Sequence, residues 1–287
     1  MRFLKIITIV FSIIISLSMV YDKFNDEINY NKIFSDIEKY KATHKIKGGR
    51  KMKDRPVILG HRGYRSKYPE NTILAYLKAI EYGGDGVELD VHLSSDNVLI
   101  IHHDDNFEKI TGDKRKIREM TSKEIMKIKI DGEPVPTLEE VFVKLPEYAY
   151  INVEIKDPDA SELAYNVVKS FNAFDRVLFS SFEIESLRRL RNLDKDIDLG
   201  LLIEDKERIE KIMDLHKELN FYSLNLPVEG IEMLGLDNFK TLISKYSEIG
   251  LHIVIWTLND IKTLENLDGY IDAVITDDIE KIVNYYK

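Results

Sequence analysis

The feature that most constrains the fold is an alternation of two hydrophobic periods over residues 56–287. Short runs rich in β-branched residues alternate with longer segments whose apolar residues recur at the spacing of an α-helix. Strands that alternate with helices form a parallel sheet, and eight strands in a segment of this length predict a TIM (β/α)8 barrel. A doubly wound open sheet is the structural alternative, but no G-x-G-x-x-G sequence follows the first expected strand.

Each expected element can be given bounds from this alternation. The strands are predicted at residues 57–60, 86–90, 150–155, 176–180, 198–203, 221–224, 251–256 and 273–276. The helices between them are predicted at residues 70–82, 161–171, 184–192, 206–219, 239–249, 261–267 and 279–286.

The connection between the second and third strands is longer than the others. It contains an extended run at 98–101 and helical patterns near 121–127 and 137–145. Thr137 and Glu140 have the spacing of a capping box, which starts the last of these helices. We therefore expect a small insertion after the second strand, and such long loops on a barrel often form lids or substrate walls.

The first 21 residues form a separate hydrophobic segment. Arg2 and Lys5 precede an uncharged apolar run at 6–21, which is typical of an uncleaved signal-anchor or of a cleaved signal peptide. The run is shorter than the roughly 20 residues that span a membrane, no A-x-A cleavage sequence follows it, and a buried soluble helix is the third interpretation. We expect a barrel that is anchored to the membrane and faces outside, or is secreted. A cytoplasmic location is less favoured.

Residues 22–55 are predicted to form a polar, basic linker before the barrel at 56–287. Ile28, Ile33, Phe34 and Ile37 have the spacing of a short amphipathic helix within it. Residues 39–55 carry eight basic side chains and one acidic side chain. This charge either attracts anionic lipid headgroups or belongs to a solvated tether.

Charge and cysteine content exclude several classes of function. With 41 basic and 50 acidic residues, the net charge of -9 argues against a nucleic-acid partner, which requires a basic surface. The absence of cysteine excludes disulfides, a thiolate nucleophile and cysteine-ligated zinc or iron–sulfur clusters. The sequence gives no indication of a protein partner.

Polar and aromatic side chains lie at the predicted strand ends, where a TIM barrel builds its active site. Residues two apart on a strand point to the same face, so two pairs of charged residues are expected to converge. The candidate site residues are His61, Arg62, Glu88, Asp90, His103, Glu154, Lys156, Phe182 and Trp256.

Three of these candidates are carboxylates, which repel one another unless a cation joins them. The oxygen ligands of Glu88, Asp90 and Glu154 suit one divalent cation such as Ca²⁺ or Mg²⁺. Arg62 and Lys156 add positive charge that can bind an anion with several oxygens, and phosphate is the first candidate.

Two histidines complete the expected chemistry. His61 and His103 carry the side chain best suited to proton transfer near neutral pH. Two such histidines, together with a metal and two cationic side chains, are typical of phosphoester hydrolysis. His102 and His103 are adjacent, so on an extended chain only one of them faces the site. Phe182 and Trp256 are expected to belong to the core or to wall the pocket.

Several short sequences resemble those of glycerophosphodiester phosphodiesterases, in the same order. They are His61-Arg62-Gly63, Pro69-Glu70-Asn71-Thr72, Gly86-Val87-Glu88-Leu89-Asp90, His103-Asp104-Asp105, Thr111-Gly112, Pro136-Thr137-Leu138-Glu139-Glu140, Glu154-Ile155-Lys156 and Trp256-Thr257-Leu258-Asn259. The resemblance covers about residues 57–287. It implies a TIM barrel with a small insertion that hydrolyses glycerophosphodiesters to glycerol 3-phosphate and an alcohol.

The resemblance also assigns roles to the candidate residues. It implies that the three carboxylates are metal ligands, that the two histidines are the acid–base pair, and that the two cations hold the phosphate. The three sets are Glu88, Asp90 and Glu154; His61 and His103; and Arg62 and Lys156.

Two other functions remain open at this level. A membrane-tethered barrel can act on a lipid phosphodiester such as a lysophospholipid, which the apolar N-terminal run and the basic linker favour. A non-catalytic binding barrel is a different class, and the complete set of polar candidates at the strand ends argues against it.

Overall fold

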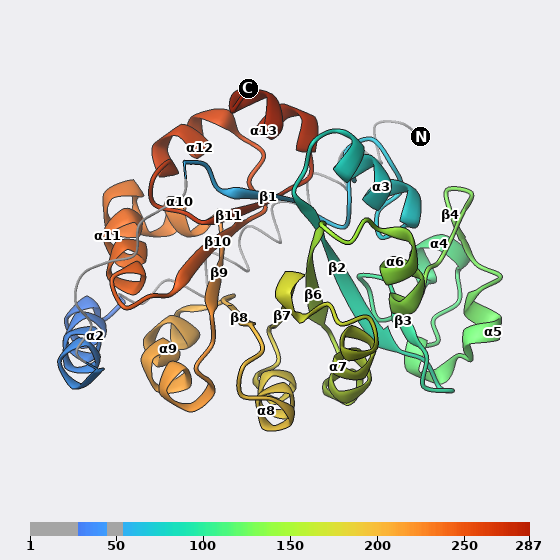
Figure 1. Ribbon diagram of the computed structural model, residues 1–287, viewed down its shortest axis with the longest axis horizontal. Coiled ribbons are helices and arrows are strands. Elements are labelled where there is room, and N and C mark those ends of the chain that lie inside the picture. Colours follow the sequence, from blue (N-terminus) through green and yellow to red (C-terminus); the bar gives the residue numbers. More distant parts are fainter. Residues whose placement is uncertain (1–27, 45–53) are drawn as a thin grey trace.

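Eight parallel strands close into a barrel with helices outside it (Figure 1). The structure is a computed structural model and describes residues 28–44 and 54–287. β1 pairs with both β2 and β11, which closes the ring, and β3 adds to β2 in the antiparallel direction. The barrel strands are β1 (Val57–Gly60), β2 (Gly86–Leu93), β6 (Tyr150–Ile155), β7 (Val177–Ser181), β8 (Leu199–Leu202), β9 (Ser223–Pro227), β10 (His252–Trp256) and β11 (Ala273–Thr276).

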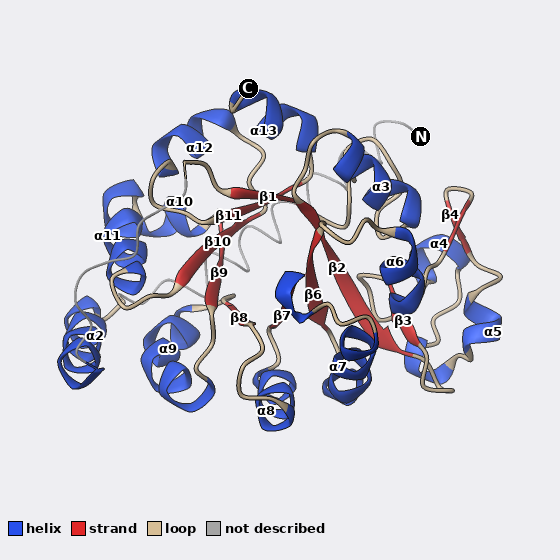
Figure 2. Cartoon of the chain, viewed as in Figure 1, coloured by secondary structure: helices blue, strands red, loops and turns tan. Residues whose placement is uncertain are grey.

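Helices cover the outside of the barrel between successive strands (Figure 2). The predicted TIM barrel is confirmed, and no open doubly wound sheet is formed by the described residues. The helices of the barrel layer are α3 (Ile73–Glu81), α6 (Leu138–Lys144), α7 (Ser161–Ser170), α8 (Ile184–Leu193), α9 (Lys206–Leu219), α10 (Gly230–Leu234), α11 (Leu236–Ser247), α12 (Ile261–Leu267) and α13 (Ile279–Tyr285), with short 3₁₀ helices at Pro158–Ala160 and Phe174–Arg176.

The predicted bounds differ from the observed ones where local chemistry decides the end of an element. α3 begins at Ile73 rather than at residue 70 because the Thr72 hydroxyl accepts from the backbone N–H of Ala75 as the N-cap. β2 continues past residue 90 to Leu93 because its last three residues pair with β3. β9 begins at Ser223, two residues later than predicted, and runs on to Pro227.

The insertion after β2 has a small hydrophobic core of its own. β3 (Leu99–Ile101), α4 (Glu108–Thr111), a 3₁₀ helix (Ile117–Glu119), α5 (Ser122–Ile125) and the hairpin of β4 (Lys129–Ile130) and β5 (Glu133–Pro134) make up this unit. Leu99 and Ile101 of β3 belong to the barrel core. The other buried apolar side chains of the insertion form a separate cluster, made of Ile100, Phe107, Ile117, Met120, Ile125, Ile130 and Val135. α6 then begins with the predicted Thr137–Glu140 capping box.

An additional helix, α2 (Tyr30–His44), packs on the outside of the barrel against α9 and α11 (Figure 1). Ile33 and Ile37 are buried in this contact, which confirms the amphipathic helix predicted from their spacing. Lys41 adds an ion pair of 2.8 Å to Glu248. Part of the predicted 22–55 linker is therefore a docked helix.

The hydrophobic segment at 1–21 lies outside the described residues and stays a prediction. Within the part of the chain that the structure describes, every helix is too short or too polar to cross a membrane.

His216 on α9 is buried beneath α2. Its ring centroid lies 5.2 Å from that of Tyr40 and 4.8 Å from that of Phe221, and its Nδ1 has no hydrogen-bond partner among the described residues. Burial lowers the pKa of His216 to about 4.

We predict that this histidine makes the chain less stable in acid. The unfolded chain takes up a proton at His216 near pH 6.5, but the folded chain resists it until about pH 4. The contribution of His216 to the free energy of unfolding is therefore lost as the pH falls through that window. The loss is about 2 kcal/mol between pH 7 and pH 4.5. Urea unfolding of the wild type and of His216→Leu at both pH values measures it. An equal loss in the two chains would contradict the prediction.

Candidate active site

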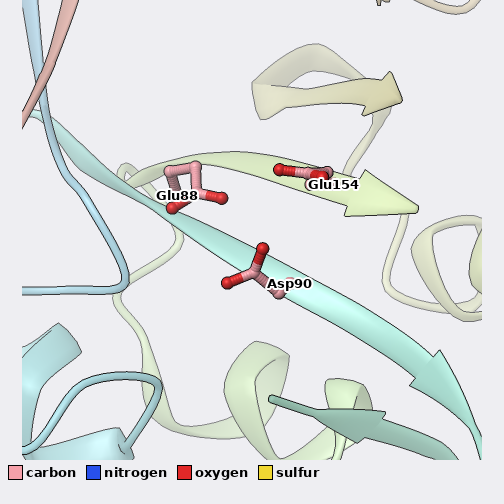
Figure 3. A group of neighbouring side chains, drawn as sticks. All are labelled: Glu88, Asp90 and Glu154. Atoms are coloured by element: carbon pink, nitrogen blue, oxygen red, sulfur yellow. The ribbon is translucent and has the colours of Figure 1, made fainter. Parts of the chain in front are cut away.

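Three carboxylates meet inside the C-terminal end of the barrel (Figure 3). Glu88 and Asp90 lie two residues apart on β2 and therefore point to the same face. Asp90 is the cross-strand neighbour of Glu154 on β6. All three are buried, and one carboxylate oxygen of each lies within 4.8 Å of the other two.

Two cations lie against this acidic triad. Lys156 Nζ is 2.9 Å from Asp90 Oδ1 and 2.5 Å from Glu154 Oε1. Arg62 Nε is 3.5 Å from Asp90 Oδ2, and the backbone N–H of Arg62 donates to Glu88 Oε2 at 2.9 Å. The Arg62 guanidinium also donates to Glu70 at 2.9 Å, so it is shared between two acidic groups.

The backbone at Arg62 is unusual. Its φ of 53° lies in the left-handed region, which bulky side chains seldom occupy. In this conformation the Arg62 N–H reaches Glu88 while the guanidinium turns toward Asp90 and Glu70. Gly63 follows with φ of 84°, and a Cβ there would lie 2.7 Å from Ala75, so only glycine fits. Backbone strain of this kind is concentrated at functional sites.

The triad does not ionise evenly. Burial, together with the charges of Asp90 and Glu154, raises the pKa of Glu88 well above its usual value. Burial likewise raises the pKa of Glu154 to about 7. Burial also opposes ionisation of Asp90, but Lys156 and Arg62 more than offset it and hold the pKa of Asp90 below its usual range. Two cations are therefore too few to keep all three carboxylates ionised.

A bound metal ion would reduce this imbalance between three carboxylates and two cationic side chains. The ligand set is made only of oxygen atoms, which hard divalent ions prefer. A bound ion would also supply the positive charge that Glu88 and Glu154 lack in order to ionise at neutral pH. The triad of Glu88, Asp90 and Glu154 can thus hold a metal ion.

His61 follows β1 and is held by a carboxylate at the end of β11. Its Nδ1 lies 2.7 Å from Oδ1 of Asp277, whose other oxygen accepts from Asn259 at 2.9 Å. Thr257 Oγ1 lies 3.3 Å from the same ring nitrogen. An ionised Asp277 keeps the proton on Nδ1 and leaves Nε2 free for proton transfer.

His103, at the start of the insertion, has the same arrangement. Its Nδ1 lies 2.8 Å from Asp104, which also pairs with Lys109 at 2.6 Å. The charges of Asp90, Arg62 and Lys156 act on its ring. Burial lowers the pKa of both His61 and His103, which favours the neutral form of each ring when no substrate is bound.

Its neighbour His102 is placed elsewhere. The His102 ring is buried and stacks on Phe107 in the core of the insertion, with ring centroids 4.4 Å apart. The two adjacent histidines therefore have different surroundings. The charge of Asp90 acts on both rings, whereas the charges of Arg62 and Lys156 act on the ring of His103.

Phe182 and Trp256 lie together near the ends of β7 and β10. Their rings make an edge contact with centroids 5.7 Å apart. Lys156 Nζ lies 6.0 Å from the centroid of Phe182, so this aromatic pair borders the charged cluster. Both side chains are partly exposed rather than buried in the core.

Sequence reasoning missed the polar residues that hold the candidate groups in place. Asn71 donates to Asp90 Oδ2 at 2.8 Å and accepts from the Tyr76 hydroxyl at 2.8 Å. Asp277 holds His61, and Asn259 holds Asp277. Asp277 directly follows the last strand, so the strand-end rule that selected His61 would also have found it.

Comparison with known proteins identifies the family of this chain. A sequence model of the glycerophosphoryl diester phosphodiesterase family matches residues 61–281. The chain belongs to this family. The match includes both histidines, both cations and the acidic triad, and it confirms the resemblance seen in the sequence.

Individual relatives agree with this assignment. A glycerophosphodiester phosphodiesterase from Caldanaerobacter subterraneus is 30% identical over 79% of this chain and 96% of the relative. The solved structure of a glycerophosphodiester phosphodiesterase from Thermotoga maritima has a TM-score of 0.72 and 34% identity, over 80% of this chain and 98% of that one. The chain is thus an enzyme of the glycerophosphodiester phosphodiesterase class.

A third relative shares the fold and is known with a bound product. A phosphodiesterase from Oleispira antarctica was solved in complex with sn-glycerol 3-phosphate. Its structure matches with a TM-score of 0.69 and 24% identity, over 81% of this chain and 97% of that one.

We predict that the triad couples metal binding to stability. Divalent cation at about 100 times its Kd should stabilise the wild type by about 2.7 kcal/mol, because the ion binds only the folded chain. Glu88→Gln should lose most of this gain. In EDTA the same variant should melt above the wild type, because a buried glutamine is neutral without the proton uptake that burial imposes on Glu88 when the chain folds.

Thermal unfolding of the full chain with Ca²⁺, Mg²⁺ or EDTA makes the measurement. Glu185→Gln, an exposed change of the same kind on α8, is the control and should behave as the wild type. A wild-type melting temperature that neither Ca²⁺ nor Mg²⁺ raises would contradict the prediction.

Proposed function

We propose that this chain hydrolyses glycerophosphodiesters to glycerol 3-phosphate and an alcohol, using one divalent cation and the acid–base pair His61 and His103. The observation that carries the proposal is the meeting of an acidic triad, two cations and two carboxylate-held histidines at one end of the barrel. Membership of the family supports the reaction class. The glycerol 3-phosphate bound to the Oleispira antarctica phosphodiesterase supports the identity of the product.

Arg62 and Lys156 are proposed to bind the phosphate. Both cations are largely buried beside the triad, so a phosphate oxygen can exchange water for charged hydrogen bonds. The Coulomb attraction of Asp90 and Glu154 outweighs burial and raises the pKa of Lys156, which keeps it charged. When it is bound, the divalent cation supplies positive charge that lowers the pKa of a coordinated hydroxyl group or water molecule.

The two histidines are proposed to move protons through Nε2. In the first step, one neutral imidazole ring takes the proton of the glycerol 2-hydroxyl while the hydroxyl oxygen forms a bond to phosphorus. The other imidazole ring, in its protonated form, donates a proton to the departing alcohol. The product of this step is a cyclic phosphodiester. Water then opens the cyclic phosphodiester, with the two histidines exchanging the roles of acid and base, and glycerol 3-phosphate is released. Asp277 and Asp104 stabilise whichever ring is protonated.

The metal is proposed to be Ca²⁺ or Mg²⁺. The oxygen-only ligand set suits both ions. The two differ in the number of ligands and in the rigidity that they require, so comparing them in the same assay identifies the preferred one.

We predict that release of glycerol 3-phosphate depends on the cation and on both histidines. The full chain should release it from glycerophosphocholine or glycerophosphoinositol with Ca²⁺ or Mg²⁺ and not with EDTA. His61→Ala and His103→Ala should each lower kcat at least about 10²-fold, because each removes a proton-transfer group. An enzymatic assay of glycerol 3-phosphate measures this.

His44→Ala, on the exposed end of α2, is the control for the two histidine variants. Near-full turnover in both site variants, with the cation still bound, would show that the mechanism is wrong. Turnover of micellar lysophospholipid without turnover of monomeric diesters would instead favour a lipid phosphodiesterase.

We predict a distinct effect for Asp277→Asn. The amide keeps the size of the side chain but no longer stabilises a protonated His61, and it can hold the ring in the wrong tautomer. We expect kcat to fall by about 10²-fold or more while KM changes little, and the pH profile of kcat to shift. Asp260→Asn, at the exposed N-cap of α12, is the matched control. A pH profile identical to that of the wild type would rule out this role for Asp277.

A further inference from the structure

Arg65, in the loop after β1, lies between two pairs of side chains that have separate roles in the proposed mechanism. Its Nη2 is 3.1 Å from Oε2 of Glu70, and its Nε is 3.6 Å from Oδ1 of Asp277. Glu70 contacts Arg62 at 2.9 Å, and Asp277 contacts His61 at 2.7 Å. We propose that Arg65 is a positioning residue, whose guanidinium holds the two pairs in one fixed arrangement. The inference rests on the proposed function and adds a residue to it.

The backbone of the loop holds Arg65 against Asp277. On one side of it, Ser66 donates its backbone N–H to the carbonyl oxygen of Asp277 at 3.1 Å. On the other side, Tyr64 is fully buried, and its backbone N–H donates to the carbonyl oxygen of Ala75 at 3.0 Å. Both neighbours of Arg65 are therefore fixed, so the guanidinium is directed toward its two carboxylates before substrate binds.

Arg65 acts on the His61 ring directly as well as through Asp277. Its Nη1 lies 3.4 Å from His61 Nδ1, the nitrogen that faces Asp277, and the Thr257 hydroxyl lies 3.3 Å from the same atom. The charged groups that act most strongly on this ring are Asp277 after β11 and Arg62 and Arg65 after β1. Burial lowers the pKa of His61, Asp277 raises it, and the two arginines lower it further. Arg65 thus opposes a positive charge on the ring.

Glu70 divides its carboxylate between two arginines. Its Oε1 accepts from Arg62 at 2.9 Å, and its Oε2 faces Arg65. Without Arg65, the whole charge of Glu70 would act on Arg62, whose guanidinium also contacts Asp90. Arg65 therefore leaves more of the Arg62 charge available to a phosphate oxygen. Its loss should weaken substrate binding in addition to changing the titration of His61.

Arg65→Met and Arg65→Lys in the full chain measure both effects, with glycerophosphocholine as substrate and Ca²⁺ or Mg²⁺ present. Arg65→Met removes the charge and keeps an unbranched apolar side chain. We expect it to raise KM several-fold and to move the limb of the pH profile of kcat/KM that His61 governs to higher pH, by roughly half a pH unit. Arg65→Lys keeps the charge without the planar set of donors, so it should retain most of the pH profile and lose part of the binding.

The His61 ring can also be titrated without turnover, by nuclear magnetic resonance. The imidazole signal that is missing from His61→Ala identifies the ring, and the pH midpoint of its titration should be higher in Arg65→Met than in the wild type. An unchanged midpoint in Arg65→Met would overturn the inference. Absence of turnover by the wild type with both cations would instead count against the proposed function, which is a different result.

Glu70→Gln tests the route from Arg65 to Arg62 in a double-mutant cycle. Arg65→Met should raise KM in the wild-type background and change it little in the Glu70→Gln background, because the charge that Arg65 shares is already gone. The higher midpoint of His61 should persist in both backgrounds, since that effect does not pass through Glu70. An equal rise of KM in the two backgrounds would overturn this half of the inference.

Arg189→Met, on α8, is the matched control. Arg189 also joins two carboxylates, Asp159 at 2.7 Å and Glu185 at 3.3 Å, but it lies on the outer layer of helices. This variant should keep the wild-type KM, pH profile and His61 midpoint, and circular dichroism checks that every variant is folded. If Arg65→Lys changed KM and the midpoint as much as Arg65→Met, the charge of Arg65 would not be responsible and the inference would be overturned.

Discussion

Repulsion among three buried carboxylates is the constraint on which the rest of this site depends. Glu88, Asp90 and Glu154 occupy one end of a barrel whose interior keeps water away from them. Like charges in such a place are tolerated only where cations and hydrogen-bond donors are supplied. Arg62, Lys156 and Asn71 supply some of both, yet burial and the neighbouring carboxylates still raise the pKa of Glu88 and Glu154.

The same constraint explains how the proposed phosphate clamp is built. Each cation serves two acidic partners: Lys156 serves Asp90 and Glu154, and Arg62 serves Asp90 and Glu70. A cation held in this way stays charged and stays in place before substrate arrives, which is the pre-organisation that stabilises transition-state charge. The unusual backbone at Arg62 belongs to this arrangement, because it directs an N–H group to Glu88 as well.

The two histidines that are proposed to transfer protons are positioned by a different set of contacts from those around the triad. His61 and His103 each turn Nδ1 toward an aspartate, and each of these aspartates has a further partner, Asn259 or Lys109. Asp277 lies after the last strand, far along the chain from His61, whereas Asp104 directly follows His103 in the sequence. The insertion therefore contributes to the proposed chemistry, since one of the two histidines lies at its start.

The sequence by itself determined the TIM barrel, the strand order, the insertion and the residues of the triad. These follow from the hydrophobic period and from spacing along single strands, which are local properties of the chain. Only the tertiary structure decided that Asp277 holds His61, that Asn71 holds Asp90, and that the Tyr30–His44 helix docks on α9 and α11. These facts depend on which strands and loops become neighbours when the barrel closes, so they join residues with no local pattern in common.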